Sequence, residues 1–281
     1  MTFTPDPEGL SNLMHLGWLP KTEREAEENF ETCHVCLARG PLTKEHIPPE
    51  SAFNDDSRLW EHLVVQGSTS ALRRARIRGG FQVSTLCARC NTARCSAYAR
   101  AYVKFVHHLV DTPALFDHRG NARLVSVSLP LFVAKEIATM VLAVEPIHFA
   151  RHHPDLRNFV LDPRSIIIPP FRILGFLVPQ LPETGTIARF HARVASFAPG
   201  FQFVGGEISW YPFGFLYATE IGPGYEPHRL TDIGSWFTAT GVRSDTKSFF
   251  TRLTGVDSLN VAIGGRRRFP QIDYLPSTHL R

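Results

Sequence analysis

Two pairs of cysteines, each with Cys-x2-Cys spacing, constrain this chain more than any other feature of its sequence. The pairs are Cys33–Cys36 (CHVC) and Cys87–Cys90 (CARC). Together they supply four thiolates, the ligand set of a closed tetrahedral zinc site. We therefore expect a structural Zn2+ on these four residues, with reduced core cysteines or a redox pair as the alternatives. The fifth cysteine, Cys95, is expected to be a small buried residue on a helix.

The composition is that of a globular protein. Of the 281 residues, 43% are hydrophobic and 20% are charged, which excludes a disordered chain. The first residues, MTFTPDPEGL, lack the basic and apolar regions of a signal peptide. The apolar run from Leu131 to Val144 is interrupted by Lys135 and Glu136, so it is too short for a membrane span. We therefore expect a cytoplasmic protein with no membrane partner, in which cysteines bind metal rather than form disulfides.

The net charge of +4 is unevenly distributed. Residues 30–110 hold eleven basic and six acidic side chains, a net of +5, whereas residues 1–29 have a net of −4. Arginine clusters suit contacts with phosphates, so the arginines around the cysteine pairs are candidate nucleic-acid contacts. A solvated surface is the alternative. The candidates are Arg73, Arg74, Arg76, Arg78 and Arg94.

The first half of the chain is expected to alternate short strands and helices. Prolines that cannot donate to a ladder end a strand at 42–47, and alternating apolar residues indicate a second strand. Asn91 is expected to start a helix that ends before Pro113, and two further helices are expected upstream. The predicted elements are a helix at 21–31, strands at 42–47 and 81–86, a helix around 59–65 and a helix from 91 to about 112.

The second half predicts a helix followed by antiparallel strands. Pro130 suits the first turn of a helix with one apolar face, which Pro146 ends. Strands are expected at 171–178, 186–194, 207–211 and 215–221. The fold class is therefore α+β. The expected units are a helical lead-in at 1–29, a zinc-containing domain at 30–115 and a C-terminal α+β domain of unknown role at 120–281.

Three short motifs follow one another between residues 30 and 110, and their order is informative. They are CHVC, then EHIPP at 45–49, then CARCN at 87–91. Together they resemble the HNH (His-Me finger) endonuclease family. The resemblance implies a ββα-metal nuclease unit stapled by zinc, followed in this chain by the mixed C-terminal domain.

The residue types within these motifs suit phosphodiester hydrolysis. A histidine can take a proton from water near neutral pH, and carboxylate and amide oxygens suit magnesium. The resemblance implies His46 as general base, with Glu45 and Asn91 holding one Mg2+ or Mn2+. As alternatives, His46 could be hydrogen-bonded beneath the zinc knuckle, and Asn91 could serve as a helix N-cap. His34 is expected to be exposed, because four thiolates already fill the zinc site.

Neighbouring residues of an ideal strand point to opposite faces, so Glu45 and His46 cannot both face one cation there. Pro48 is expected to bend the chain and relax this conflict. The sequence also departs from the family pattern in two ways. Glu45 replaces the more common Asp. The second histidine of the motif would fall roughly two to three helical turns after Asn91, near Arg100, and is missing.

The resulting functional expectation is a metal-dependent endonuclease, with DNA favoured over RNA as the substrate. The family context also suggests defence against foreign DNA. Two alternatives remain open: a zinc-stapled nucleic-acid-binding module that has lost catalysis, and a protein-interaction adaptor. The C-terminal domain is a candidate surface for a protein partner or for homo-oligomerisation.

Overall fold

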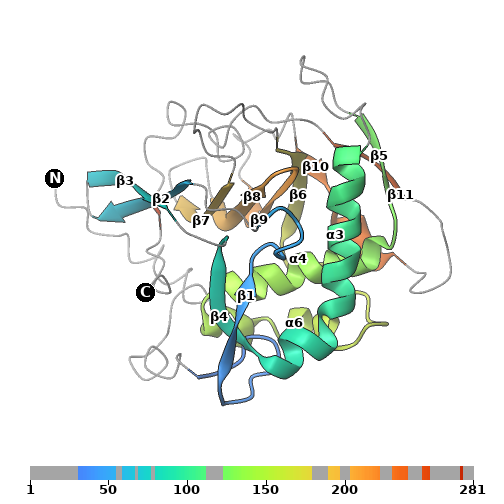
Figure 1. Cartoon of the computed structure of the whole chain (residues 1–281), viewed down its shortest axis with the longest axis horizontal. Coiled ribbons are helices and arrows are strands. Elements are labelled where there is room, and N and C mark those ends of the chain that lie inside the picture. Colours follow the sequence, from blue (N-terminus) through green and yellow to red (C-terminus); the bar gives the residue numbers. More distant parts are fainter. Residues whose placement is uncertain are drawn as a thin grey trace.

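The computed structural model describes ten segments of the chain, which form an α+β fold (Figure 1). The segments are residues 31–54, 59–66, 69–76, 80–111, 123–178, 189–196, 203–221, 230–239, 249–253 and 273–274. The helix expected at 21–31 lies outside them except for Glu31, and Arg78 lies outside them as well.

Two antiparallel strands followed by a helix form the first part of the fold. Strand β1 (Leu42–His46) pairs with β4 (Gln82–Cys87). The chain then enters a π-helical turn, η1 (Arg89–Arg94), and continues as α3 (Ser96–Asp111). The two expected strands are confirmed. The expected helix is interrupted where η1 closes, because the backbone N–H of Cys95 binds the carbonyl of Cys90 at 3.1 Å.

Between β1 and β4 the chain forms a hairpin. Strands β2 (Leu59–Gln66) and β3 (Thr69–Arg76) pair antiparallel over their full lengths. The helix expected around 59–65 is therefore wrong. The two strands are separated by Gly67-Ser68, the kind of two-residue spacer that joins hairpin strands.

Three helices follow β5 (Arg123–Val127), and a proline marks the start of each. They are α4 (Pro130–Val144), α5 (Ile147–His152) and α6 (Pro154–Leu161). Pro130 and Pro154 occupy the first turns, and Pro146 is the N-cap of α5. A proline suits these positions because the first N–H groups of a helix have no intrahelical partner. The helix expected at α4 is confirmed, but it is buried on nearly all sides rather than along one face.

The C-terminal strands form a six-stranded antiparallel sheet in the order β10-β6-β9-β8-β7-β12. Its strands are β6 (Arg172–Leu177), β7 (Arg189–Ser196), β8 (Phe203–Trp210), β9 (Phe213–Ile221), β10 (Thr231–Asp232) and β12 (Asp273–Tyr274). The four strands expected there are confirmed with shifted ends. Strand β11 (Phe249–Leu253) pairs with β5.

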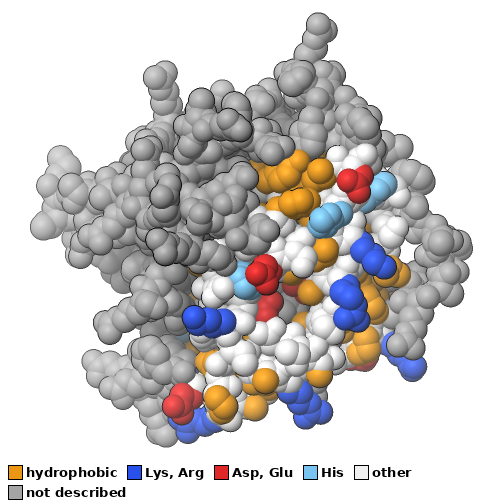
Figure 2. Space-filling view, in the orientation of Figure 1, with side chains coloured by type: hydrophobic (Ala, Val, Ile, Leu, Met, Phe, Trp, Pro, Cys, Tyr) orange, Lys and Arg blue, Asp and Glu red, His pale blue; other side chains and the backbone are white. Residues whose placement is uncertain are grey.

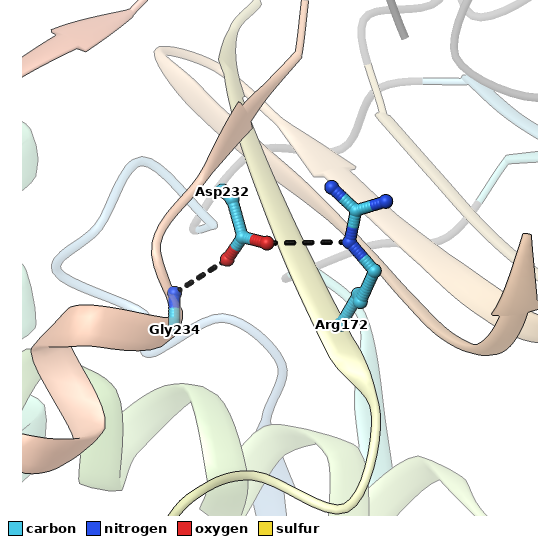
Figure 3. Close-up of polar contacts among 3 residues, drawn as sticks. All are labelled: Arg172, Asp232 and Gly234. Atoms are coloured by element: carbon cyan, nitrogen blue, oxygen red, sulfur yellow. Dashed lines mark hydrogen bonds and ion pairs between the residues drawn. The ribbon is translucent and has the colours of Figure 1, made fainter. Parts of the chain in front are cut away.

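The turn after β10 is held by one carboxylate (Figure 3). Asp232 accepts the backbone N–H of Gly234 at 2.9 Å and the Nε–H of Arg172 at 3.2 Å. Gly234 begins the short 3-10 helix η3 (Gly234–Thr238). The two bonds thereby connect β6, β10 and η3.

One apolar core joins the β1–β4–α3 part to the rest of the described chain. It contains Cys33 and Phe105 from the first part, Ile137 from α4, and Phe213 and Trp236 from the C-terminal part. Helix α3 packs across α4, which it meets nearly at a right angle in the view of Figure 1. Among the described helices, none is both long and apolar enough to cross a membrane.

Candidate metal centre and adjoining polar site

The first cysteine pair lies on a tight turn before β1. The Cys33 N–H binds the carbonyl of Ala38 at 2.9 Å, and the Leu37 N–H binds the carbonyl of Cys33 at 2.8 Å. Leu37 has a φ of 58°, in the left-handed region. This reversal turns the chain back so that Cys33 and Cys36 lie on the same side of the turn.

The second cysteine pair spans the junction of β4 and η1. Cys87 ends β4 and Cys90 lies in η1. The four sulfur atoms lie within 4.8 Å of one another, and Cys36 Sγ is 3.7 Å from Cys87 Sγ. Zn–S bonds of 2.3 Å in tetrahedral geometry would place sulfurs roughly 3.8 Å apart. The expected cluster is confirmed, and it could hold a structural metal ion such as zinc.

The thiols of this cluster perturb one another. A hydrogen bond from Cys90 lowers the pKa of Cys33 to about 4. The same contact raises the pKa of Cys90, and burial raises that of Cys36. Adjacent thiolates repel one another, so Cys36 and Cys90 hold their protons beside the Cys33 thiolate unless a cation replaces them.

His34, between the first two cysteines, is buried rather than exposed, so that expectation was wrong. Its side chain is 1% exposed, and its Nδ1 lies 2.9 Å from the carbonyl oxygen of Leu142 near the end of α4. Burial lowers the pKa of His34 to about 4. The Thr85 hydroxyl makes a parallel bond, donating to the carbonyl of Ala143 at 2.9 Å. His34 and Thr85 therefore attach the cysteine centre to α4.

Glu45 and His46 lie at the end of β1, directly after an irregularity in its pairing. Thr43 pairs with Leu86 but Glu45 pairs with Val83, so two residues of β4 face Lys44. Such a bulge bends the strand and redirects side chains. The chain also bends after His46, as the prolines predict. Burial raises the pKa of Glu45 to about 7.

The His46 ring contacts the opposite strand. Its Nε2 lies 2.7 Å from the Gln82 side-chain amide, the residue directly paired with it. The contact holds the half-buried ring in one orientation.

Asn91 binds β1 from the first turn of η1. Its Nδ2 donates to Thr43 Oγ1 and to the carbonyl of Lys44, both at 3.0 Å. The Thr43 hydroxyl donates in turn to the carbonyl of Leu86. These bonds hold Asn91 against β1, beside the residue that precedes Glu45; the shared ion expected on Glu45 and Asn91 stays a prediction. Figure 2 shows acidic and histidine side chains together in the middle of the described face, with basic side chains on either side.

Asn54 is a positioning residue that the motifs did not indicate. Its side chain is completely buried, donates to the carbonyls of Pro48 and Phe81, and accepts the N–H of Phe81. Gly80 packs against it with a φ of +78°, and a Cβ there would lie 1.9 Å from Asn54 O. Asn54 therefore ties the segment after His46 to the start of β4. Asn54 and Gly80 are far apart in the sequence, so no local pattern indicates that they meet.

The candidate arginines are only partly placed. Arg73, Arg74 and Arg76 lie on β3, where they pair with His62, Glu61 and Leu59 respectively. Arg94 ends η1. Whether the side chains of these residues contact nucleic acid stays a prediction.

Glu136 is a second group that the sequence analysis did not single out as functional. It lies in the buried part of α4, and burial together with the charge of Glu45 raises its pKa well above the usual range. Cys95, expected to be a small buried residue, is confirmed as one and lies in the same region. Burial, followed by the charges of Glu136 and Glu45 among others, raises the pKa of Cys95 to about 12.

Comparison with protein-family models, curated proteins and solved structures finds no match to this chain.

Proposed function

We propose that the chain is a metal-dependent endonuclease of the HNH type that hydrolyses phosphodiester bonds in DNA. The observation that carries the proposal is the pair of hydrogen bonds from Asn91 Nδ2 to Thr43 and Lys44. They hold η1 against the strand that carries Glu45 and His46. This attachment supports a site in which a candidate base and two oxygen donors act together, which is what this hydrolysis needs.

His46 is assigned the role of general base. Imidazole titrates near neutral pH and can accept the proton of an attacking water. The Gln82 amide nitrogen, 2.7 Å from Nε2, is a donor, so Nε2 carries the lone pair and is the nitrogen assigned to proton abstraction once the attacking water takes the place of Gln82. The deprotonated water attacks phosphorus, and the bond from phosphorus to the leaving 3′ oxygen breaks.

Glu45 and Asn91 are assigned to hold one Mg2+ or Mn2+. Such an ion, when bound, would stabilise the negative charge that develops on the phosphoryl and leaving oxygens. The donor set fits, because carboxylate and amide oxygens are the ligands these ions prefer. Both hydrogen bonds of Asn91 given above use its nitrogen, which makes the amide oxygen the atom that would face a cation.

The four cysteines are assigned a structural Zn2+. Cys90 and Asn91 are consecutive residues of η1, so zinc bound to Cys90 would hold the turn that presents Asn91. The ion would also join the turn before β1 to the end of β4 through Cys36 and Cys87. Structural zinc sites contribute directly to folding in this way.

The arginines of β3 and η1 are assigned to the DNA backbone. Arg73, Arg74, Arg76 and Arg94 lie in the segment with the chain's highest positive charge. Binding through phosphates releases counterions, so the affinity is expected to fall steeply as salt increases.

Plasmid cleavage tests the proposal. The purified full chain, loaded with zinc, is incubated with supercoiled plasmid and Mg2+ or Mn2+, and in parallel with EDTA. The comparison is between the wild type, His46→Ala and a matched control, His152→Ala, which changes an exposed histidine on α5. We expect nicking or linearisation by the wild type and the control, and at least a hundredfold slower cleavage by His46→Ala.

Three results would contradict the proposal. Cleavage that survives His46→Ala would mean a contaminant or a different base. DNA binding without cleavage by any of the proteins would favour the zinc-stapled binding module. Absence of salt-sensitive DNA binding would favour the protein-interaction adaptor.

A further inference from the structure

Glu136 in α4 is a buried carboxyl group that the proposed mechanism does not yet use. Its side chain is only 2% exposed, and its Oε2 has no hydrogen-bond partner among the described residues. A buried carboxyl oxygen without a partner costs free energy. The adjacent Lys135 is directed elsewhere, because its ammonium donates to the carbonyls of Phe159, Asp162 and Ser165.

The side of α4 that carries Glu136 faces η1. Thr139 lies one turn further along the same side of the helix. Its hydroxyl is 3.9 Å from the Sγ of Cys95, the residue that closes η1. Helices α3 and α4 also pack directly on each other. Glu136 therefore lies on the side of α4 that faces Cys95, the residue that closes η1.

Glu45 approaches the same region from β1. Its charge acts on the Glu136 carboxyl, and both carboxylates act on the Cys95 thiol. Asn91 is bonded to Lys44, the residue directly before Glu45. Glu45 on β1 and Glu136 on α4 are thus close enough for their charges to interact, and Asn91 of η1 is bonded beside Glu45. Two carboxyls whose charges interact repel each other when both are ionised, and a divalent cation removes that repulsion.

We propose that Glu136 is a third protein ligand of the divalent cation assigned to Glu45 and Asn91, contributed by α4 from outside the β1–β4–α3 unit. The inference rests on the proposed function for the place of that cation. It also accounts for the missing second histidine. The position where the motif would put it falls near Arg100, an exposed residue of α3 whose side chain cannot ligate a cation. In this chain the buried carboxylate of α4 takes that place.

Direct measurement of Mn2+ binding tests the inference without any reaction. The zinc-loaded full chain is titrated with Mn2+, and free Mn2+ is followed by electron paramagnetic resonance. Zn2+ gives no signal in this measurement. The comparison includes Glu136→Gln, which keeps the shape of the side chain, and Glu31→Gln, which changes an exposed carboxylate. We expect one Mn2+ per wild-type chain and at least a tenfold weaker affinity in Glu136→Gln. Glu31→Gln should bind like the wild type.

Wild-type affinity in Glu136→Gln, or no Mn2+ binding by the wild type, would overturn the inference. If Glu136→Gln does not fold, Glu136→Asp is used instead. This variant retains the charge, but its side chain is one methylene shorter, so the same loss of Mn2+ affinity is expected. The result is separable from the nuclease proposal. Glu136-dependent Mn2+ binding in a chain that cleaves no DNA supports the inference alone, whereas cleavage with unchanged Mn2+ affinity in Glu136→Gln supports the nuclease alone.

Discussion

Asn54 holds the segment after His46 through its buried side-chain amide. The amide donates to Pro48 and Phe81 and accepts the Phe81 N–H at 2.8 Å. The Ile47 N–H also binds the Phe81 carbonyl, at 3.0 Å. The position of His46 at the end of β1 therefore depends on a residue that has no part in the proposed chemistry.

Replacing Asn54 by alanine should destabilise the protein by about 3 kcal/mol. The substitution removes the hydrogen bonds that Asn54 makes with the Pro48 carbonyl and the Phe81 N–H, and each buried group left unpaired costs about 1–3 kcal/mol. Urea denaturation of the zinc-loaded protein measures the loss. The matched control is Asn158→Ala, on the exposed face of α6, which should change stability by less than about 0.5 kcal/mol. A loss below about 1 kcal/mol in Asn54→Ala would contradict the role given to this residue.

Helix α4 is the central element of the described fold. It packs against α3, α5, α6, β4 and η3. A helix buried on all sides is normally apolar throughout, yet α4 contains Lys135 and Glu136 in consecutive positions. The contacts of the Lys135 ammonium compensate for its burial. The ammonium lies among backbone carbonyls at the C-terminal end of α6, where the helix dipole favours a cation. It also lies 3.6 Å from the centre of the Phe159 ring.

Lys135→Met should weaken the attachment of α6 to α4 and lower the free energy of unfolding by about 3 kcal/mol. Methionine fills a similar volume but leaves the carbonyls of Phe159, Asp162 and Ser165 without this donor. The control is Lys104→Met on the exposed side of α3, for which little change is expected. Equal urea denaturation midpoints for the two variants would contradict this role. They would show that the Lys135 ammonium adds nothing to the stability that its aliphatic chain provides.

At the scale of the whole molecule, the cysteine centre and the C-terminal part are physically continuous. His34 and Thr85 bond to the last turn of α4. The same apolar core contains Cys33 near one end of the chain and Phe237 in η3. The expected boundary between residues 115 and 120 stays a prediction about sequence units. The shared core predicts that the units on either side of it stabilise each other.

Loss of zinc should therefore destabilise the whole chain in one step. Metal analysis is expected to find one zinc per chain in the wild type and none in Cys36→Ser. The thermal unfolding midpoint of that variant should fall by roughly 10 °C or more, because structural zinc contributes several kcal/mol. Cys95→Ala is the control, since Cys95 lies outside the cluster and zinc content should be retained. Two separate unfolding transitions, with the second unchanged, would contradict the coupling.

The sequence by itself determined the features that depend on local spacing. The Cys-x2-Cys pairs predicted the four-cysteine cluster, because a tight turn places two ligands on one ion. Prolines predicted the end of β1 and the start of α4, because proline cannot donate a backbone hydrogen bond. The β2–β3 hairpin was missed although Gly67-Ser68 offered a local signal, since its mixed composition resembled a short helix.

Only the tertiary structure decided which distant residues meet. His34 bonds to a residue 108 positions away, Asn54 joins the two ends of a long insertion, and Glu136 approaches Glu45 from another helix. Side-chain periodicity within a segment says how much of it is buried but not against which partner. For that reason α4 was expected to bury one face. His34 was expected to be exposed because four thiolates already fill the zinc site, an argument that likewise leaves out the neighbouring helix. Both errors have one cause: the packing of α4 against the cysteine centre and the C-terminal part, which no local pattern encodes.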